Sequence, residues 1–136
     1  MTVTRNKIQP SKLFVRGGVE PLYSHVMAVE GAKKLIFISG QVARNSKGET
    51  VGKGDMRVQM EQVFENISIC LEAAGANLSD IVKTNTYVTD IDEFFKCGDI
   101  RRRYLGEALP ASAAIQISRL ASPDLMIEIE AIAAVG

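Results

Sequence analysis

The sequence predicts an α+β fold in which a mixed β-sheet carries two helices on one face. Strand-like and helical runs follow one another as two or three strands, helix, strand, helix and two strands. Two strand–helix–strand segments beside hairpin-like segments are typical of a mixed sheet with its crossovers on one side. The length of 136 residues, without repeats, indicates a single domain spanning 1–136, with residues 1–19 as an N-terminal extended segment.

Hydrophobic periodicity predicts the individual elements. Strands alternate apolar and polar residues, and the first two are joined by the short "GAK", which predicts a hairpin. Asp55 is a good N-cap for a helix whose apolar residues recur at helical spacing and which ends at Gly75. A second helix ends before Pro110. The predicted strands are 23–30, 34–40, 80–90, 111–118 and 125–135, and the predicted helices are 55–74 and 92–107.

The last predicted strand has apolar residues on both of its sides. Ile127 and Ile129 alternate with Met126 and Ile132. With only two helices to cover one face of the sheet, we expect another copy of the chain to cover the other face.

Charge and composition limit the classes of partner. Sixteen basic and sixteen acidic residues cancel, so the chain lacks the strong field that draws proteins to nucleic acid or anionic membranes. The longest apolar stretch falls well short of the roughly 20 residues of a membrane span, and the N-terminus lacks the apolar region of a secretory signal. These features predict a cytoplasmic protein. Cys70 and Cys97 have no metal-type spacing and are expected to be unpaired.

The segment "MIEIEAIA" places Glu128 and Glu130 on one face of an otherwise apolar strand. A carboxylate in that position can orient or deprotonate water, or it can accept structural hydrogen bonds at a seam between subunits. We expect Glu130 to pair with a Lys or Arg.

Four segments, in order and spacing, resemble the RidA (YjgF) family of enamine and imine deaminases: "LYSHVMAVEG", "LIFISGQV", "ICLEAAGANLSDIVKTNTYVTDIDEF" and "LMIEIEAIA". The resemblance begins near residue 20. It implies a chorismate-mutase-like fold, a homotrimer, and a substrate pocket in the cleft between subunits. It also implies hydrolysis of an enamine or imine without a metal or cofactor.

The resemblance assigns roles to particular residues. Tyr23 matches the tyrosine of the early strand, and Ser39, Gly40 and Gln41 match the "SGQ" segment whose backbone amide meets a substrate carboxylate. Glu128 matches the glutamate that positions the attacking water.

One departure concerns the residue that binds the substrate carboxylate. Family deaminases read P-A-R in the segment that begins at Pro110, whereas this chain reads P-A-S and places Ser112 where that arginine is expected. Serine has neither the charge nor the reach of a guanidinium. Arg101 stands near the position of a family asparagine. The run 101–103 is either a solvated helix end or, like Arg44, the source of a replacement guanidinium.

Two functions of different classes follow. The first is a deaminase whose substrate is an enamine or imine other than the usual 2-aminoacrylate. The second is a non-catalytic trimer that keeps the fold and serves either to bind a ligand, such as a carboxylate, or to regulate by protein interaction. A ribonuclease, proposed for some relatives, is disfavoured because no basic face is evident. His25, the only histidine, is either a proton carrier or an interface residue.

Overall fold

The computed structural model describes residues 2–18 and 20–136. Its strands are β1 (Thr4–Ile8), β2 (Val26–Glu30), β3 (Lys34–Val42), β4 (Ile81–Val88), β5 (Ala111–Gln116) and β6 (Ile127–Val135). Its helices are α1 (Met56–Ala73), the 3-10 turn η1 (Leu78–Asp80), α2 (Ile91–Phe95) and α3 (Gly98–Leu105).

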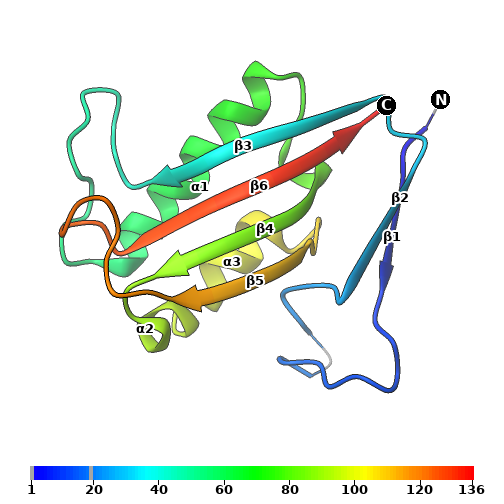
Figure 1. Cartoon of the computed structure of the whole chain (residues 1–136), viewed down its shortest axis with the longest axis horizontal. Helices are drawn as coiled ribbons and strands as arrows, with labels where there is room; N and C mark the ends of the chain where they lie inside the picture. Colours follow the sequence, from blue (N-terminus) through cyan, green and yellow to red (C-terminus); the bar gives the residue numbers. More distant parts are fainter. Residues whose placement is uncertain (1, 19) are drawn as a thin grey trace.

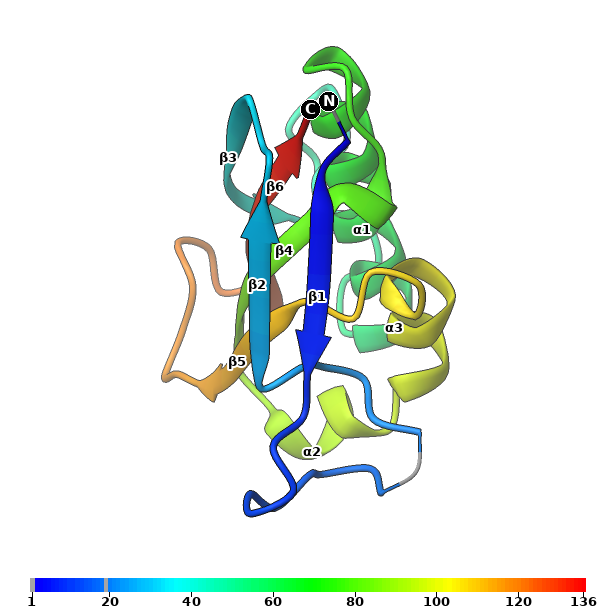
Figure 2. The same ribbon diagram turned by 90° about the vertical axis from the view of Figure 1, so that its right-hand side faces the viewer.

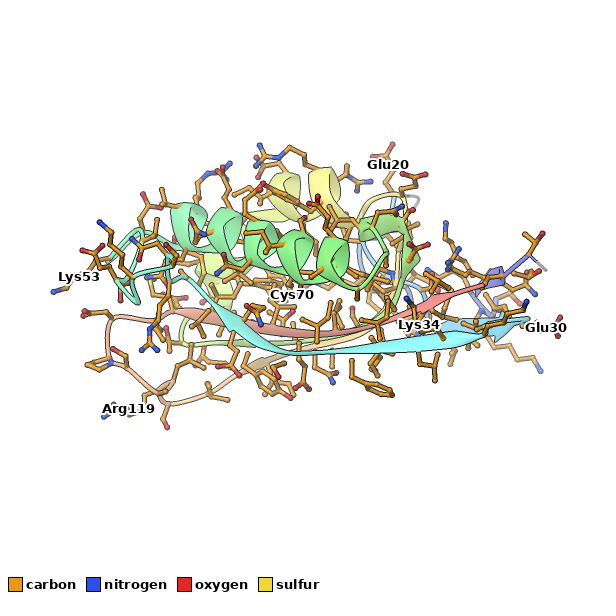
Figure 3. All side chains as sticks on the ribbon, turned by 90° about the horizontal axis from the view of Figure 1, so that it is seen from above. Glu20, Glu30, Lys34, Lys53, Cys70 and Arg119 are labelled. Atoms are coloured by element: carbon orange, nitrogen blue, oxygen red, sulfur yellow. The ribbon has the colours of Figure 1, made fainter. Side chains whose placement is uncertain are left out.

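Four strands form the central sheet in the order β3-β6-β4-β5, and the helices lie on one side of it (Figure 1). β4 and β5 are parallel, while β6 runs antiparallel to both β3 and β4. Seen edge-on in Figure 3, the helices form one layer, and side chains from the other sheet face project away from it. This two-layer arrangement confirms the predicted α+β class. We call the uncovered side of the sheet the open face.

Helix α1 supplies most of the helical side of the core, as its sequence predicts. The side chain of Asp55 caps the helix by accepting a hydrogen bond from the Val58 amide at 3.1 Å. Gly75 follows the last turn with φ +81°, the left-handed conformation in which glycine is favoured. The fully buried apolar residues of α1 are Met60, Val63, Phe64, Ile67 and Leu71.

The predicted hairpin between residues 23–30 and 34–40 is wrong. β2 pairs with β1, whose strand was not predicted, and β3 pairs with β6. The β1–β2 ribbon is a separate two-stranded sheet beside the central sheet, and it faces the viewer in Figure 2. A short loop with glycine reverses the chain direction, but strand pairing depends on which partners bury their apolar faces. β3 buries Ile36 and Ile38 under the helices beside β6.

The predicted second helix is divided in two. α2 ends at Phe95, and α3 begins at Gly98, after Cys97 leaves helical geometry. The break lets Phe94, Cys97 and Ile100 all point into the core. Burial raises the pKa of the Cys97 thiol.

The open face mixes apolar and charged residues. Leu35, Phe37 and Ile115 are 56%, 72% and 46% exposed there, beside Glu128 and Glu130. No helix in the described ranges has the combination of length and apolar character that a bilayer crossing requires.

Candidate functional site

Glu128 lies at a bulge in β3. Ile38 and Gln41 pair with residues two apart on β6, so β3 carries one extra residue at Ser39–Gly40. A Cβ atom at position 40 would overlap the carboxylate of Glu128. Because glycine has no Cβ, Gly40 lets this carboxylate lie against the main chain of β3.

The two carboxylates of β6 have different surroundings. Glu130 Oε1 accepts hydrogen bonds from Asn85 Nδ2 at 3.0 Å and from the Tyr87 hydroxyl at 3.1 Å. The bond to Glu130 is the main cause that raises the pKa of Tyr87. The predicted Lys or Arg partner of Glu130 is thus wrong, because an amide and a phenol from β4 fill its place. Within the described residues, no donor bonds the Glu128 carboxylate, which is left to bind water or a ligand.

Arg101 is a buried guanidinium. Its side chain points from α3 toward the edge strand β5, where Nη2 donates to Ser112 Oγ at 3.0 Å and Nε donates to the Leu22 carbonyl at 3.1 Å. The residue is only 7% exposed. Across residues 2–18 and 20–136, no carboxylate lies within ion-pair distance of it.

Burial shifts the pKa of Arg101 without changing its charge at neutral pH. Desolvation lowers that pKa to about 10, and no anionic group raises it. A protonated guanidinium that is buried and unpaired is costly, and an anionic ligand would offset that cost. Arg101 and Ser112 together therefore form a seat for an anion, which we call the Arg101–Ser112 seat.

Of the two interpretations of the run 101–103, the solvated helix end describes Arg102 and Arg103 but not Arg101, which is buried. Arg103 pairs with Glu61 at 3.2 Å, and Arg102 bonds a backbone carbonyl at the surface. The spacing contained the signal, because Cys97, Arg101 and Leu105 recur every four residues and all three are buried. The alternative source, Arg44, lies after β3 in an isolated bridge with Thr50 and does not line the cavity beside Arg101.

A cavity of about 640 Å³ opens beside the Arg101–Ser112 seat. It lies between the N-terminal loop, α2, α3 and β5, and Tyr23 lines it. Tyr23 lies within the predicted strand 23–30, but in the structure it precedes β2, which begins at Val26. Its hydroxyl accepts a hydrogen bond from the Arg16 amide at 3.0 Å. His25 meets the Tyr23 ring edge-on with centroids 5.2 Å apart, and its Nε2 lies 2.8 Å from the Phe14 carbonyl oxygen. Both aromatic residues therefore hold the N-terminal loop, through the Arg16 amide and the Phe14 carbonyl.

The residues predicted for one site fall into two groups on opposite sides of the sheet. Ser112 pairs with Thr84, which is buried under the helices, so Ser112 faces the helical side. Glu128 pairs with Tyr87 on the open face. β4 also separates their strands, adding about 10 Å. One group, on the helical side, contains Tyr23, Arg101 and Ser112, and the other contains Ser39, Gly40 and Glu128.

The described part of the chain holds no cluster of three or more His, Cys, Asp or Glu side chains arranged for a metal ion.

Comparison with known proteins relates this geometry to a family. A family model described as "Endoribonuclease L-PSP" matches residues 18–135. A "RutC family protein" of Pyrococcus horikoshii is 39% identical over 121 residues, which cover 89% of this chain and 94% of that protein. The human 2-iminobutanoate/2-iminopropanoate deaminase is 32% identical over 120 residues, covering 88% and 84%.

The same relationship extends to solved structures. A crystal structure of YyfB from Yersinia pestis, described as a protein of unknown function of the conserved Rid protein family, superposes with a TM-score of 0.81. Its sequence is 36% identical, and the match covers 96% of this chain and 98% of that one.

Proposed function

Because this chain belongs to the Endoribonuclease L-PSP family, the RidA/YjgF/RutC group, which includes 2-iminobutanoate/2-iminopropanoate deaminases, we propose that it is a hydrolytic deaminase of 2-imino acids and their enamine tautomers. It works without a metal or cofactor. The position of Glu128 carries this proposal: its carboxylate lies over Gly40, and no described donor bonds it.

The reaction needs one activated water. Glu128 accepts a proton from a water that adds to the imine carbon, and the C–O bond forms as the C=N double bond becomes single. Glu128 passes this proton to the nitrogen, which gives a neutral carbinolamine. Glu128 then takes the hydroxyl proton of the carbinolamine and transfers it to the nitrogen, so that the C–N bond breaks, ammonia leaves, the carbonyl forms and Glu128 is again ionised. Positioned proton transfer of this kind accelerates reactions by about 10²–10⁴-fold.

The Arg101–Ser112 seat is the proposed site for the substrate carboxylate. A guanidinium binds a carboxylate through charge-assisted hydrogen bonds, and here it approaches from α3 in place of the family arginine expected on β5. Tyr23 lines the same cavity. The backbone of Ser39 and Gly40 is the second polar wall, beside Glu128.

The complete site is a property of a homotrimer in this proposal. Within one chain the Arg101–Ser112 seat faces the helices and Glu128 faces the open side, so a bound imine reaches both groups only between two copies. The exposed Phe37 and Leu35 support this assembly, because exposed apolar side chains on the open face are stabilised by burial against another subunit.

A non-catalytic carboxylate-binding trimer is the second candidate. It is favoured by the same separation, since a ligand held at the Arg101–Ser112 seat need not reach Glu128.

A coupled assay distinguishes these two functions. An amino-acid oxidase generates 2-imino acids in situ, and ammonia release is followed with and without the protein. We expect release at least about tenfold faster than spontaneous hydrolysis for one or more imines. Carboxylate binding without acceleration of any imine would leave the binding protein as the function.

Ser112→Arg, the change toward the usual family residue, is expected to destabilise this chain. The new guanidinium would lie beside Arg101 with no described carboxylate to pair with it. An uncompensated buried charge costs about 3–5 kcal/mol. The double variant Arg101→Asn/Ser112→Arg, which has only one guanidinium, should recover most of this loss in urea unfolding. A single Ser112→Arg variant as stable as wild type would contradict the placement of Arg101.

A further inference from the structure

The cavity beside the Arg101–Ser112 seat has predominantly apolar walls. Leu22 closes it from the N-terminal loop, Met60 from α1, and Phe94 and Phe95 from α2. Ala114 lines it from β5, where its partner on β4 is a buried threonine, so Ala114 faces the helical side. We call these five residues the apolar chamber.

The lining of this cavity suits two different chemical groups. Arg101 provides a protonated group without a described carboxylate partner, and the chamber provides apolar and aromatic surface beside it. A molecule that complements both Arg101 and the chamber has a carboxylate next to a large apolar group. A volume of about 640 Å³ greatly exceeds the needs of a methyl or ethyl side chain.

The N-terminal loop contacts the aromatic part of the chamber. The guanidinium of Arg16 lies 3.7 Å from the ring centroid of Phe95, and the Arg16 amide donates a hydrogen bond to the Tyr23 hydroxyl. This contact holds the N-terminal loop against Phe95, and Arg16 itself lines the cavity.

We infer that the preferred substrates are 2-imino acids with an aromatic or long aliphatic side chain, which the apolar chamber accepts while Arg101 binds the carboxylate. This inference rests on the proposed deaminase function. It assigns specificity to Leu22, Phe94 and Ala114, which line the chamber and take no part in the proton transfers.

Unreactive carboxylates test the chamber separately from catalysis. Isothermal titration calorimetry of the whole protein compares propanoate with 3-phenylpropanoate. Burial of a phenyl group should lower Kd by about ten- to a hundredfold. Equal affinities for the two acids would overturn the inference.

A variant that fills the chamber provides a second test of the inference. Ala114→Phe should raise the Kd of 3-phenylpropanoate by at least about tenfold and leave that of propanoate within about threefold. Ala114→Ser, of nearly the same size, is the matched control and should keep the wild-type preference. Retention of the full preference in Ala114→Phe, in a variant whose thermal unfolding shows it is folded, would overturn the role of the chamber.

Turnover separates this inference from the proposed function. With imines generated from alanine and phenylalanine, kcat/KM is expected to be higher for the phenylalanine-derived imine. A preference for 3-phenylpropanoate in binding, without turnover of either imine, would refute the deaminase and leave the chamber standing. Faster turnover of the alanine-derived imine would refute the chamber and leave the deaminase standing.

Discussion

Glu128→Gln is expected to lower kcat for imine hydrolysis by about 10²–10⁴-fold, because the amide cannot accept the proton of the attacking water. Glutamine nearly preserves the shape of the side chain lying over Gly40, so the fold and carboxylate binding should persist. Steady-state ammonia release measures kcat, and calorimetric titration with an unreactive carboxylate verifies that the variant still binds.

Glu130→Gln is the matched control on the same strand and the same face. Glu130 accepts hydrogen bonds from Asn85 and Tyr87, so its replacement should lower stability by about 1–3 kcal/mol and change kcat far less. A Glu128→Gln variant with wild-type kcat, or a Glu130→Gln variant that loses equally much, would contradict the assignment of the proton acceptor.

Arg101→Met is expected to raise KM for 2-imino acids by about 100-fold, the loss of charge-assisted hydrogen bonds to a carboxylate. Methionine fills much of the same space without the charge. The ionised Arg101 is disfavoured by burial, so we expect the melting temperature of the variant not to fall. Initial rates over a range of substrate concentration, together with thermal unfolding, separate a binding role from a structural one.

Arg103→Met is the control for this change. Arg103 belongs to the same helix and pairs with Glu61 at the surface, so its loss should leave KM within about twofold. An unchanged KM in Arg101→Met would refute the Arg101–Ser112 seat.

In wild type, affinity for carboxylates should fall as pH rises through about 10, because the folded-state pKa of Arg101 lies there and only the protonated guanidinium binds an anion.

Local patterns predicted the elements whose stability is local or strongly amphipathic. Helix α1 follows from the Asp55 cap and the regular apolar spacing that reaches Leu71. β6 follows from its alternation, which placed Glu128 and Glu130 on one face. The predicted hairpin is wrong because pairing is decided between distant segments: β3 pairs with β6, which lies far along the chain, for example Ile38 with Ala131.

The candidate site was likewise predictable from local sequence in one part and not in another. Four-residue spacing from Cys97 through Arg101 to Leu105 is a local signal that Arg101 is buried, although a charged run normally indicates a solvated surface. Nothing local indicated that its guanidinium meets Ser112, because that contact needs α3 to pack against the start of β5.

By itself, the sequence determined the α+β class, helix α1 and the shared face of the two carboxylates on β6, because periodicity within an element assigns its faces. Only the tertiary structure decided which of the two carboxylates accepts hydrogen bonds within the chain, since the donors to Glu130 come from β4. It also decided that Ser112 and Glu128 lie on opposite faces of the sheet. Both outcomes depend on strand order and register, which arise from burial between segments far apart in the chain.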